Sequence, residues 1–263
     1  MYTMGVDIGS TSSKIIILED GMKIIGNIVV QSGTGTSGPT IATAKAKSFL
    51  SNNNLTLDDI SKIVVTGYGR FSFDIADKQI SEITCHTKGI NFLVPEARTI
   101  LDIGGQDTKA ISVNDKGQVL QFFMNDKCAA GTGRFLEVMA KILEIPLEKM
   151  GEYDKLSTNP VAISSTCTVF AESEVISQLS KGISKENILA GVHNSTANKV
   201  CGLLYRTGIK EKIVLCGGVA QNQGVVRALQ EELKKEITIA PHPQMTGAIG
   251  AALFAYEEAN KNL

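Results

Sequence analysis

An eight-residue segment occurs twice in this chain, and this repeat constrains the fold more than any other feature of the sequence. Residues 7–14 read DIGSTSSK, and residues 102–109 read DIGGQDTK. Each copy follows an apolar, strand-like stretch and leads into another. A strand, a turn rich in Gly, Ser and Thr, and a returning strand form a β-hairpin whose backbone N–H groups can bind an anion. The sequence therefore predicts two related half-molecules that hold the phosphates of a nucleotide between their hairpins.

The two copies supply the candidate catalytic and phosphate-binding residues. Asp7 and Asp102 offer carboxylate oxygens suited to Mg²⁺, usually through water. We favour Gln106 over Asp107 for orienting the attacking water, and Lys14 either reaches a phosphate or is a surface residue of its strand. The phosphate-binding candidates are Gly9, Ser10, Thr11, Ser12, Ser13 and Lys14 in the first copy and Gly104, Gly105, Gln106 and Asp107 in the second, with Thr108 close by.

Other phosphate-binding motifs are excluded. The chain has no G-x-x-x-x-G-K-S/T sequence, and neither copy reads G-x-G-x-x-G or leads directly into a helix. One D-I-G sequence would be ordinary strand-end chemistry, but two copies with matching Asp, Ile, Gly and Lys positions are hard to explain in that way. The repeat thus favours a duplicated hairpin site over a P-loop or a dinucleotide-binding site.

Composition narrows the class of protein. The chain has 263 residues, enough for one large or two modest domains, and is 43% hydrophobic and 20% charged. A formal net charge of −1 argues against a nucleic-acid or anionic membrane partner. No apolar run is long enough to span a bilayer, and the N-terminus lacks a signal-like segment. These absences predict a cytoplasmic protein, in which five cysteines without a C-x-x-C motif argue against a disulfide framework.

The apolar pattern predicts a mixed α/β chain with two domains. We expect the domains over 1–97 and 98–245, with a final helix over 246–263 returning to the first. Small residues that open this helix suit either a crossing between domains or ordinary close helix packing. Strands are expected near 3–8, 13–19, 22–31, 62–65, 99–103, 108–114, 118–124 and 212–216, and helices near 41–50, 135–143, 186–206 and 222–235.

Two cysteines precede apparent helix starts, for which Thr132 and Thr168 are candidate N-caps. A thiol at a helix N-terminus is biased towards the thiolate, and the helix dipole favours an anionic neighbour such as an iron–sulfur cluster. Cys128 and Cys167 cannot complete a 4Fe–4S site by themselves, but a two-fold dimer would supply four thiolates. Zinc binding and a buried structural role stay open on spacing alone, and Cys201 and Cys216 are interpreted as core residues.

The doubled hairpin, residues 217–222 (GGVAQN) and Gly247-x-x-Gly250 together resemble the superfamily of actin, sugar kinases and heat-shock chaperone ATPases. This resemblance implies an α/β fold of two duplicated actin-like ATPase domains with a nucleotide cleft between them. It also places Gly217, Gly218 and Asn222 beside the adenosine of ATP or ADP. Glycines let the backbone approach a flat base closely, although a plain strand-to-helix turn would read the same.

A narrower resemblance covers essentially the whole chain. Residues 66–70 (TGYGR), 101–107 (LDIGGQD) and the cysteine segments 125–135 and 164–172 resemble the activators of 2-hydroxyacyl-CoA dehydratases, the BadF/BadG/BcrA/BcrD-type ATPases. The resemblance implies a homodimer that binds one 4Fe–4S cluster through Cys128 and Cys167 of each subunit. It implies an electron taken from ferredoxin or flavodoxin and driven by MgATP hydrolysis into an iron–sulfur dehydratase of anaerobic amino-acid fermentation.

Two other classes of function remain open from the sequence. A kinase of the same fold would phosphorylate a sugar or a carboxylate, consume ATP only with its acceptor and have no chromophore. A regulator or scaffold would bind ATP and a partner without redox-linked hydrolysis. The two cysteine segments favour the activator over both.

Overall fold

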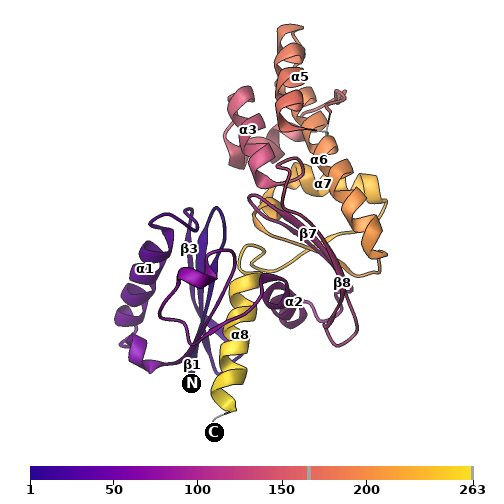
Figure 1. Cartoon of the computed structure of the whole chain (residues 1–263). Helices are drawn as coiled ribbons and strands as arrows, with labels where there is room; N and C mark the ends of the chain where they lie inside the picture. Colours follow the sequence, from indigo (N-terminus) through magenta and orange to yellow (C-terminus); the bar gives the residue numbers. More distant parts are fainter. Residues whose placement is uncertain (165–166, 262–263) are drawn as a thin grey trace. The chain divides into compact units, whose positions relative to one another are not determined.

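The computed structural model describes residues 1–164 and 167–261, and the chain in it divides into two compact units. Unit 1 comprises Met1–Glu96, Asp115–Val119 and the chain from Gln244 on, and unit 2 comprises Ala97–Asn114 and Leu120–Pro243. Each unit is built on a five-stranded sheet (Figure 1). Ser165 and Thr166 of the second cysteine segment and residues 262–263 of the expected final helix lie outside the described residues.

The sheet of unit 1 has the strand order β3-β2-β1-β4-β5. β1 pairs antiparallel with β2 and parallel with β4, β2 pairs antiparallel with β3, and β4 pairs parallel with β5. Because both faces of the central strands are covered, their residues are almost all buried rather than alternating. The strands are β1 (Tyr2–Ile8), β2 (Ser13–Glu19), β3 (Lys23–Val30), β4 (Ile60–Thr66) and β5 (Lys78–Gln79).

Helices cover both faces of this sheet. α1 (Gly38–Asn52) packs on β2 and β3, and α8 (Thr246–Asn260) packs on β1, β2 and β4 beside α2 (Glu82–Leu93) (Figure 1). The small residues of α8 allow this close packing, since a Cβ on Gly250 would lie 1.8 Å from the carbonyl oxygen of Cys85 in α2. Within unit 1, the small residues therefore serve close helix packing.

The sheet of unit 2 has the strand order β10-β9-β6-β7-β8, which is the order of unit 1 read from the opposite edge of the sheet. β6 pairs antiparallel with β7 and parallel with β9, as β1 does with β2 and β4. One large hydrophobic core joins this sheet to its helices. The elements are β6 (Thr99–Ile103), β7 (Thr108–Val113), β8 (Val119–Asn125), β9 (Ile213–Cys216) and β10 (Thr238–Ile239), with α3 (Gly133–Leu143), α4 (Met150–Asp154), α5 (Thr168–Ser180), α6 (Lys185–Thr207) and α7 (Gln223–Leu233).

The strands and helices expected from the apolar pattern are present, so the predicted duplicated α/β fold class is confirmed. Bounds differ by a few residues: α1 begins at Gly38 rather than near residue 41, and α7 begins at Gln223. α2 and the two-residue edge strands β5 and β10 were not predicted. None of the helices in the described part of the chain has the length and apolar character that crossing a bilayer requires.

Candidate active site

The first repeated segment forms the predicted hairpin between β1 and β2. Asp7 and Lys14 are directly opposite in the strand register, and Lys14 Nζ lies 2.9 Å from Asp7 Oδ2. The turn is closed by a hydrogen bond from the Gly9 N–H to the Ser12 carbonyl (3.0 Å). Asp7 Oδ1 is buried and has no hydrogen-bond partner among the described residues. An ionised carboxylate oxygen left in this state is a site for a cation or for a water bound to one.

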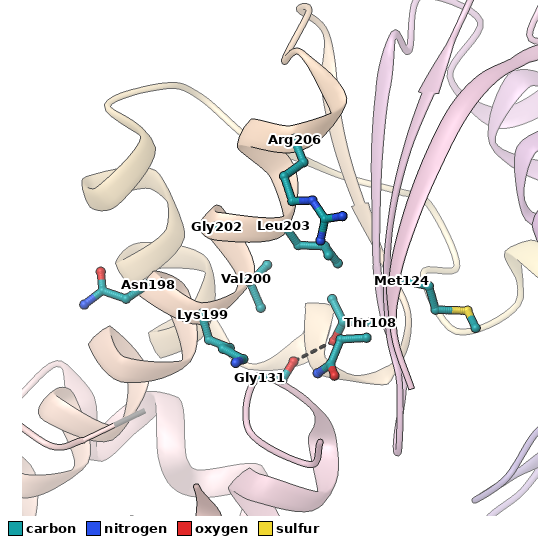
Figure 2. Close-up of a pocket in the computed structure, with 10 residues that line it drawn as sticks. Thr108, Met124, Gly131, Asn198, Lys199, Val200, Gly202, Leu203 and Arg206 are labelled. Atoms are coloured by element: carbon teal, nitrogen blue, oxygen red, sulfur yellow. Dashed lines mark hydrogen bonds between the residues drawn. The ribbon is translucent and has the colours of Figure 1, made fainter. Parts of the chain in front are cut away.

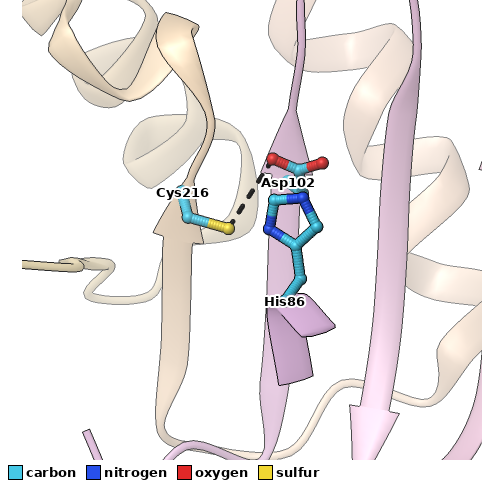
Figure 3. A group of neighbouring side chains, drawn as sticks. All are labelled: His86, Asp102 and Cys216. Atoms are coloured by element: carbon cyan, nitrogen blue, oxygen red, sulfur yellow. Dashed lines mark hydrogen bonds between the residues drawn. The ribbon is translucent and has the colours of Figure 1, made fainter. Parts of the chain in front are cut away.

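The second segment forms an equivalent hairpin between β6 and β7. Asp102 and Lys109 are opposite each other, and Lys109 Nζ lies 3.3 Å from Asp102 Oδ2. The Gly104 N–H closes the turn onto the Asp107 carbonyl (2.9 Å). Asp102 Oδ1 lies 3.7 Å from the thiol sulfur of Cys216 at the end of β9 (Figure 3). Both oxygens of Asp102 therefore have contacts inside unit 2, whereas Asp7 Oδ1 has no hydrogen-bond partner among the described residues.

Gln106 and Asp107 differ in what their side chains do. Asp107 is buried and Lys109 Nζ lies 2.6 Å from its Oδ2, so this carboxylate is held by a salt bridge inside the hairpin. Gln106 is exposed at the tip of the same turn. A group that orients a water molecule at a phosphate has to extend from the turn, and Gln106 meets this condition whereas Asp107 does not.

A glycine of left-handed conformation contacts each of the two aspartates. Gly67 after β4 has φ +87°, and a Cβ there would lie 2.6 Å from Asp7 Oδ1. Gly217 after β9 has φ +85°, and a Cβ there would lie 2.7 Å from Asp102 Oδ1. The duplication thus includes the parallel strand beside each hairpin and not only the repeated segment. Sequence reasoning missed Gly67 as a site residue; the signal was a Gly directly after a strand in both halves.

Asn222, expected beside adenosine, caps a helix in this structure. Its Oδ1 accepts hydrogen bonds from the N–H groups of Gly224 (3.0 Å) and Val225 (3.3 Å) at the start of α7. Its Nδ2 lies 3.2 Å from His193 Nε2. The Gly-Gly turn before it is a short 3₁₀ helix, Gly218–Gln221, and Gly218 is exposed. The side chain of Asn222 therefore fixes the end of this turn, while the backbone of Gly218 stays accessible.

A buried polar network supports this cap. His193 is fully buried in α6, and its Nδ1 lies 2.7 Å from Asp154 Oδ1. Arg227 Nε lies 2.7 Å from Asp154 Oδ2. Burial alone would raise the pKa of Asp154, but hydrogen bonds from His193 and Arg227 lower it to about 2. Burial lowers the pKa of His193 despite the carboxylate, so the neutral imidazole, donating through Nδ1, accepts from Asn222. No local sequence signal marks this network, because its members come from three helices.

The cysteines fall into two groups. Cys85, Cys201 and Cys216 are buried, and burial raises the pKa of both Cys85 and Cys201 to about 12. This confirms the core interpretation of Cys201 and Cys216. Cys128 and Cys167 are only half-buried. They precede α3 and α5, two helices that pack against each other in unit 2 (Figure 1).

Of the two predicted N-cap residues, Thr132 is confirmed and Thr168 is wrong. Thr132 is the N-cap residue of α3, but its hydroxyl donates to the Ala129 carbonyl (2.7 Å) and not to the helix. The N-cap residue of α5 is Cys167 itself, and Thr168 is the first residue of the helix. Thr168 Oγ1 is buried and lacks a hydrogen-bond partner among the described residues. Cys167 is thus one position closer to the N-terminus of the helix than the sequence indicated.

Comparisons with known proteins show which family the chain belongs to. The BadF/BadG/BcrA/BcrD ATPase family model matches residues 4–255. The activator of lactoyl-CoA dehydratase from Anaerotignum propionicum is 62% identical over 99% of this chain and 100% of its own. The (R)-2-hydroxyglutaryl-CoA dehydratase activating ATPase from Acidaminococcus fermentans is 53% identical, with 99% of each chain covered.

A solved structure extends the similarity to the fold. It is described as the activator of the 2-hydroxyisocaproyl-CoA dehydratase from Clostridium difficile with bound ADPNP. Its TM-score is 0.96 at 53% identity, covering 100% of this chain and 97% of the other. These matches confirm the resemblance to dehydratase activators and the expectation of an ATPase, and this chain belongs to the BadF/BadG/BcrA/BcrD ATPase family.

Proposed function

We propose that this chain is an ATP-hydrolysing iron–sulfur activator that delivers a low-potential electron to an (R)-2-hydroxyacyl-CoA dehydratase. The relatives matched over nearly their full length bear the names of dehydratase activators. The observation that carries the iron–sulfur part is the pair Cys128 and Cys167, half-buried before two packed helices while the other three cysteines are core residues. An accessible pair of thiols held at helix starts is suited to metal binding rather than to core packing.

In this proposal each hairpin turn binds nucleotide phosphate through backbone N–H groups. Residues 1–97 with 246–263 form one ATPase domain, and residues 98–245 form the other. The partnerless Asp7 Oδ1 fits a water molecule of hydrated Mg²⁺, and Asp102 is the corresponding residue of the second hairpin. Gln106 orients the attacking water, and the backbone at Gly217 and Gly218 lies against adenosine. Lys14 neutralises Asp7 across the hairpin.

The residues around Cys167 fit an iron–sulfur cluster. Cys167 is the N-cap residue of α5, so the positive end of a 13-residue helix lies at its sulfur atom. The hydroxyl of Thr168, which has no hydrogen-bond partner among the described residues, is next in sequence, and a hydroxyl of this kind can donate to a sulfur atom. When bound, a 4Fe–4S cluster would supply one-electron chemistry at low potential.

The number of thiolate ligands that a cluster needs points to the oligomeric state of the protein. A 4Fe–4S cluster takes about four thiolates, and each chain offers two at this position, so we propose a homodimer with the cluster shared by two copies of Cys128 and Cys167. A small ferredoxin or flavodoxin would reduce this cluster, and the dehydratase would receive the electron. We propose that it acts in the cytoplasm of an anaerobic organism.

The test is the iron content and visible spectrum of strictly anaerobically purified protein, compared with the variants Cys128→Ser, Cys167→Ser and Cys201→Ala. We expect about two iron atoms per chain in the parent protein and in Cys201→Ala, the core control. Each ligand variant is expected to lose the iron and its absorbance while retaining ADPNP binding.

Two outcomes would contradict the proposal. Full iron content in Cys128→Ser or Cys167→Ser would remove the ligand assignment. An iron-free parent protein that cannot be reconstituted would remove the electron-transfer function, and a screen for sugar or carboxylate acceptors would then test the kinase alternative.

A further inference from the structure

The turn of the second hairpin and the segment that carries Cys128 are hydrogen-bonded to each other within unit 2. We define the Cys128 segment as Asn125–Thr132, from the last residue of β8 to the N-cap residue of α3. The Gly133 N–H donates to the Gly104 carbonyl (2.9 Å), and the Arg134 N–H donates to the Gly105 carbonyl (2.8 Å). The first turn of α3, which follows the Cys128 segment directly, is therefore attached to the hairpin turn.

A third hydrogen bond reaches the Cys128 segment itself. The hydroxyl of Thr108, at the start of β7, donates to the Gly131 carbonyl at 2.6 Å (Figure 2). Thr108 is 1% exposed and Gly131 is buried, so water cannot readily replace this bond. The approach is also close at Gly133, where a Cβ would lie 3.2 Å from both the Gly104 carbonyl oxygen and Gly105 Cα.

The Cys128 segment is held together internally. Asn125 Nδ2 donates to the carbonyls of Cys128 (2.8 Å) and Ala130 (3.2 Å), and Asn125 Oδ1 accepts from the Cys128 N–H (3.3 Å). The Thr132 hydroxyl closes its other end onto Ala129. A displacement applied at Gly131 is therefore transmitted to Cys128 rather than absorbed by a loose loop.

A pocket lies beside the contact between the hairpin turn and the Cys128 segment. It has a volume of about 480 Å³ and lies next to the Thr108–Gly131 hydrogen bond (Figure 2). The walls come from β7, β8, the Cys128 segment and α6, with Lys199 and Arg206 on the α6 side. Since packed side chains do not fill this volume, the Cys128 segment can shift on this side without displacing the core.

The peptide groups of the hairpin turn face two ways. The Gly104 carbonyl and the Gly105 N–H belong to one peptide group, and the Gly105 carbonyl and the Gln106 N–H belong to the next. In a trans peptide the N–H points opposite to the carbonyl. Both carbonyls point to α3, so both N–H groups point away from it, and within residues 1–164 and 167–261 neither has an acceptor. Two such N–H groups are available to a phosphate oxygen.

We propose that these two peptide groups and the positioning residue Thr108 couple the phosphate bound at the second hairpin to the Cys128 segment. This inference rests on the proposed function, because it gives the iron–sulfur ligand Cys128 its link to the nucleotide. A phosphate that accepts from the Gly105 and Gln106 N–H groups polarises their peptides and strengthens the carbonyls as acceptors for α3. Loss of the γ-phosphate weakens the same hydrogen bonds and frees the segment to move.

Thr108→Val tests the Thr108–Gly131 hydrogen bond, because valine keeps the shape of threonine and removes only its hydroxyl. Thr108→Ser restores the hydroxyl, and the control Thr196→Val removes a buried hydroxyl whose hydrogen bond, to the Val192 carbonyl, stays within α6. On anaerobic, iron-loaded protein the readout is the rate at which bathophenanthroline removes iron, measured with ADP and with ADPNP.

We expect the parent, Thr108→Ser and Thr196→Val to show different iron-removal rates with ADP and ADPNP. Thr108→Val is expected to keep its iron and its ADPNP affinity, while the ratio of the two rates falls about fivefold, the factor that one buried hydrogen bond is worth. An unchanged ratio in Thr108→Val would overturn the coupling and leave the proposed function standing. An iron-free parent protein would instead overturn the proposed function.

A second measurement needs neither a variant nor a cluster. Amide hydrogen exchange at Gly133 and Arg134 in the parent protein is expected to slow about fivefold when ADPNP replaces ADP, because both N–H groups donate to the turn that binds the γ-phosphate. Identical exchange of these two amides in both nucleotide states would overturn the inference.

Discussion

Lys14 Nζ lies 2.9 Å from Asp7 Oδ2, so an ion pair joins the two ends of the first repeated segment across the hairpin. The pair occupies one oxygen of Asp7 and leaves Oδ1 buried and without a partner in the described part of the chain. The roles of the two residues are thereby separated. In the proposed site, Lys14 balances the charge of the carboxylate, and Asp7 Oδ1 is the oxygen available to a ligand.

Asp7→Asn is predicted to reduce MgATP hydrolysis strongly while the chain stays folded. The amide cannot replace a carboxylate that holds the hydration shell of Mg²⁺, and loss of such a group typically costs about 10- to 100-fold in metal affinity or activity. The measurement is steady-state ATPase rate against Mg²⁺ concentration, with the exposed carboxylate variant Asp20→Asn as control. An unchanged Mg²⁺ dependence in Asp7→Asn would exclude the assigned role.

Gln106→Ala is predicted to slow ATP hydrolysis, whereas Asp107→Asn is predicted to lower the stability of the fold. Gln106 is exposed at the turn, so its loss is expected to lower kcat about 100-fold with little change in stability. Asp107 is bound to the buried Lys109, so its neutralisation is expected to lower the free energy of unfolding by about 1–3 kcal/mol. Single-turnover ATP hydrolysis and urea unfolding separate the two effects. If Asp107→Asn were the variant that stops hydrolysis in a fully stable protein, the assignment would be reversed.

Gly217→Ala is predicted to be much more destabilising than Gly182→Ala, although both glycines have a left-handed φ, +85° and +76°. That conformation costs alanine about 1–2 kcal/mol at either position. At Gly217 the added Cβ would also lie 2.3 Å from the Ile103 carbonyl oxygen, whereas at Gly182 nothing lies within 4 Å. Denaturant midpoints compare the two directly, and equal midpoints would show that the close approach beside Asp102 is not required.

Stability is predicted to decrease as the pH falls below the ordinary histidine pKa of 6.5, because of His193. Burial lowers the pKa of His193 in the folded chain, so below pH 6.5 the unfolded chain binds a proton that the folded chain does not. The loss approaches about 1.4 kcal/mol per pH unit for a fully suppressed titration. Urea unfolding at several pH values between 7.5 and 5.5 measures it. His193→Gln is the control, and an equal slope in that variant would contradict the assignment.

Local sequence signals predicted the elements that carry the phosphate site. The repeated Asp, Gly and Lys positions fix the hairpins, because a strand register that pairs Asp7 with Lys14 also pairs Asp102 with Lys109. The same signals could not show that each lysine pairs with its aspartate, since this depends on side-chain burial. They also could not show that Asp107 turns inward to Lys109 while Gln106 stays exposed.

Local sequence patterns could not predict the elements that are stabilised by packing against residues distant in sequence. α2 contains Gly89 and two threonines, which are poor helix formers, and its helical state depends on close contact with α8. A Cβ at Gly89 would lie 2.0 Å from the Thr246 carbonyl oxygen, a contact between residues distant in sequence. The network of Asp154, His193 and Arg227 was invisible for the same reason.

In the proposed function ATP drives an electron from this protein into a dehydratase, and mixing the two proteins tests this step. Anaerobic, reduced protein is combined in a stopped-flow instrument with a purified iron–sulfur 2-hydroxyacyl-CoA dehydratase, with and without MgATP. We predict rapid oxidation of the activator cluster and reduction of the dehydratase only when MgATP is present, and none in Cys128→Ser. Electron transfer that proceeds equally without ATP, or that fails with it while the cluster is intact, would contradict the account.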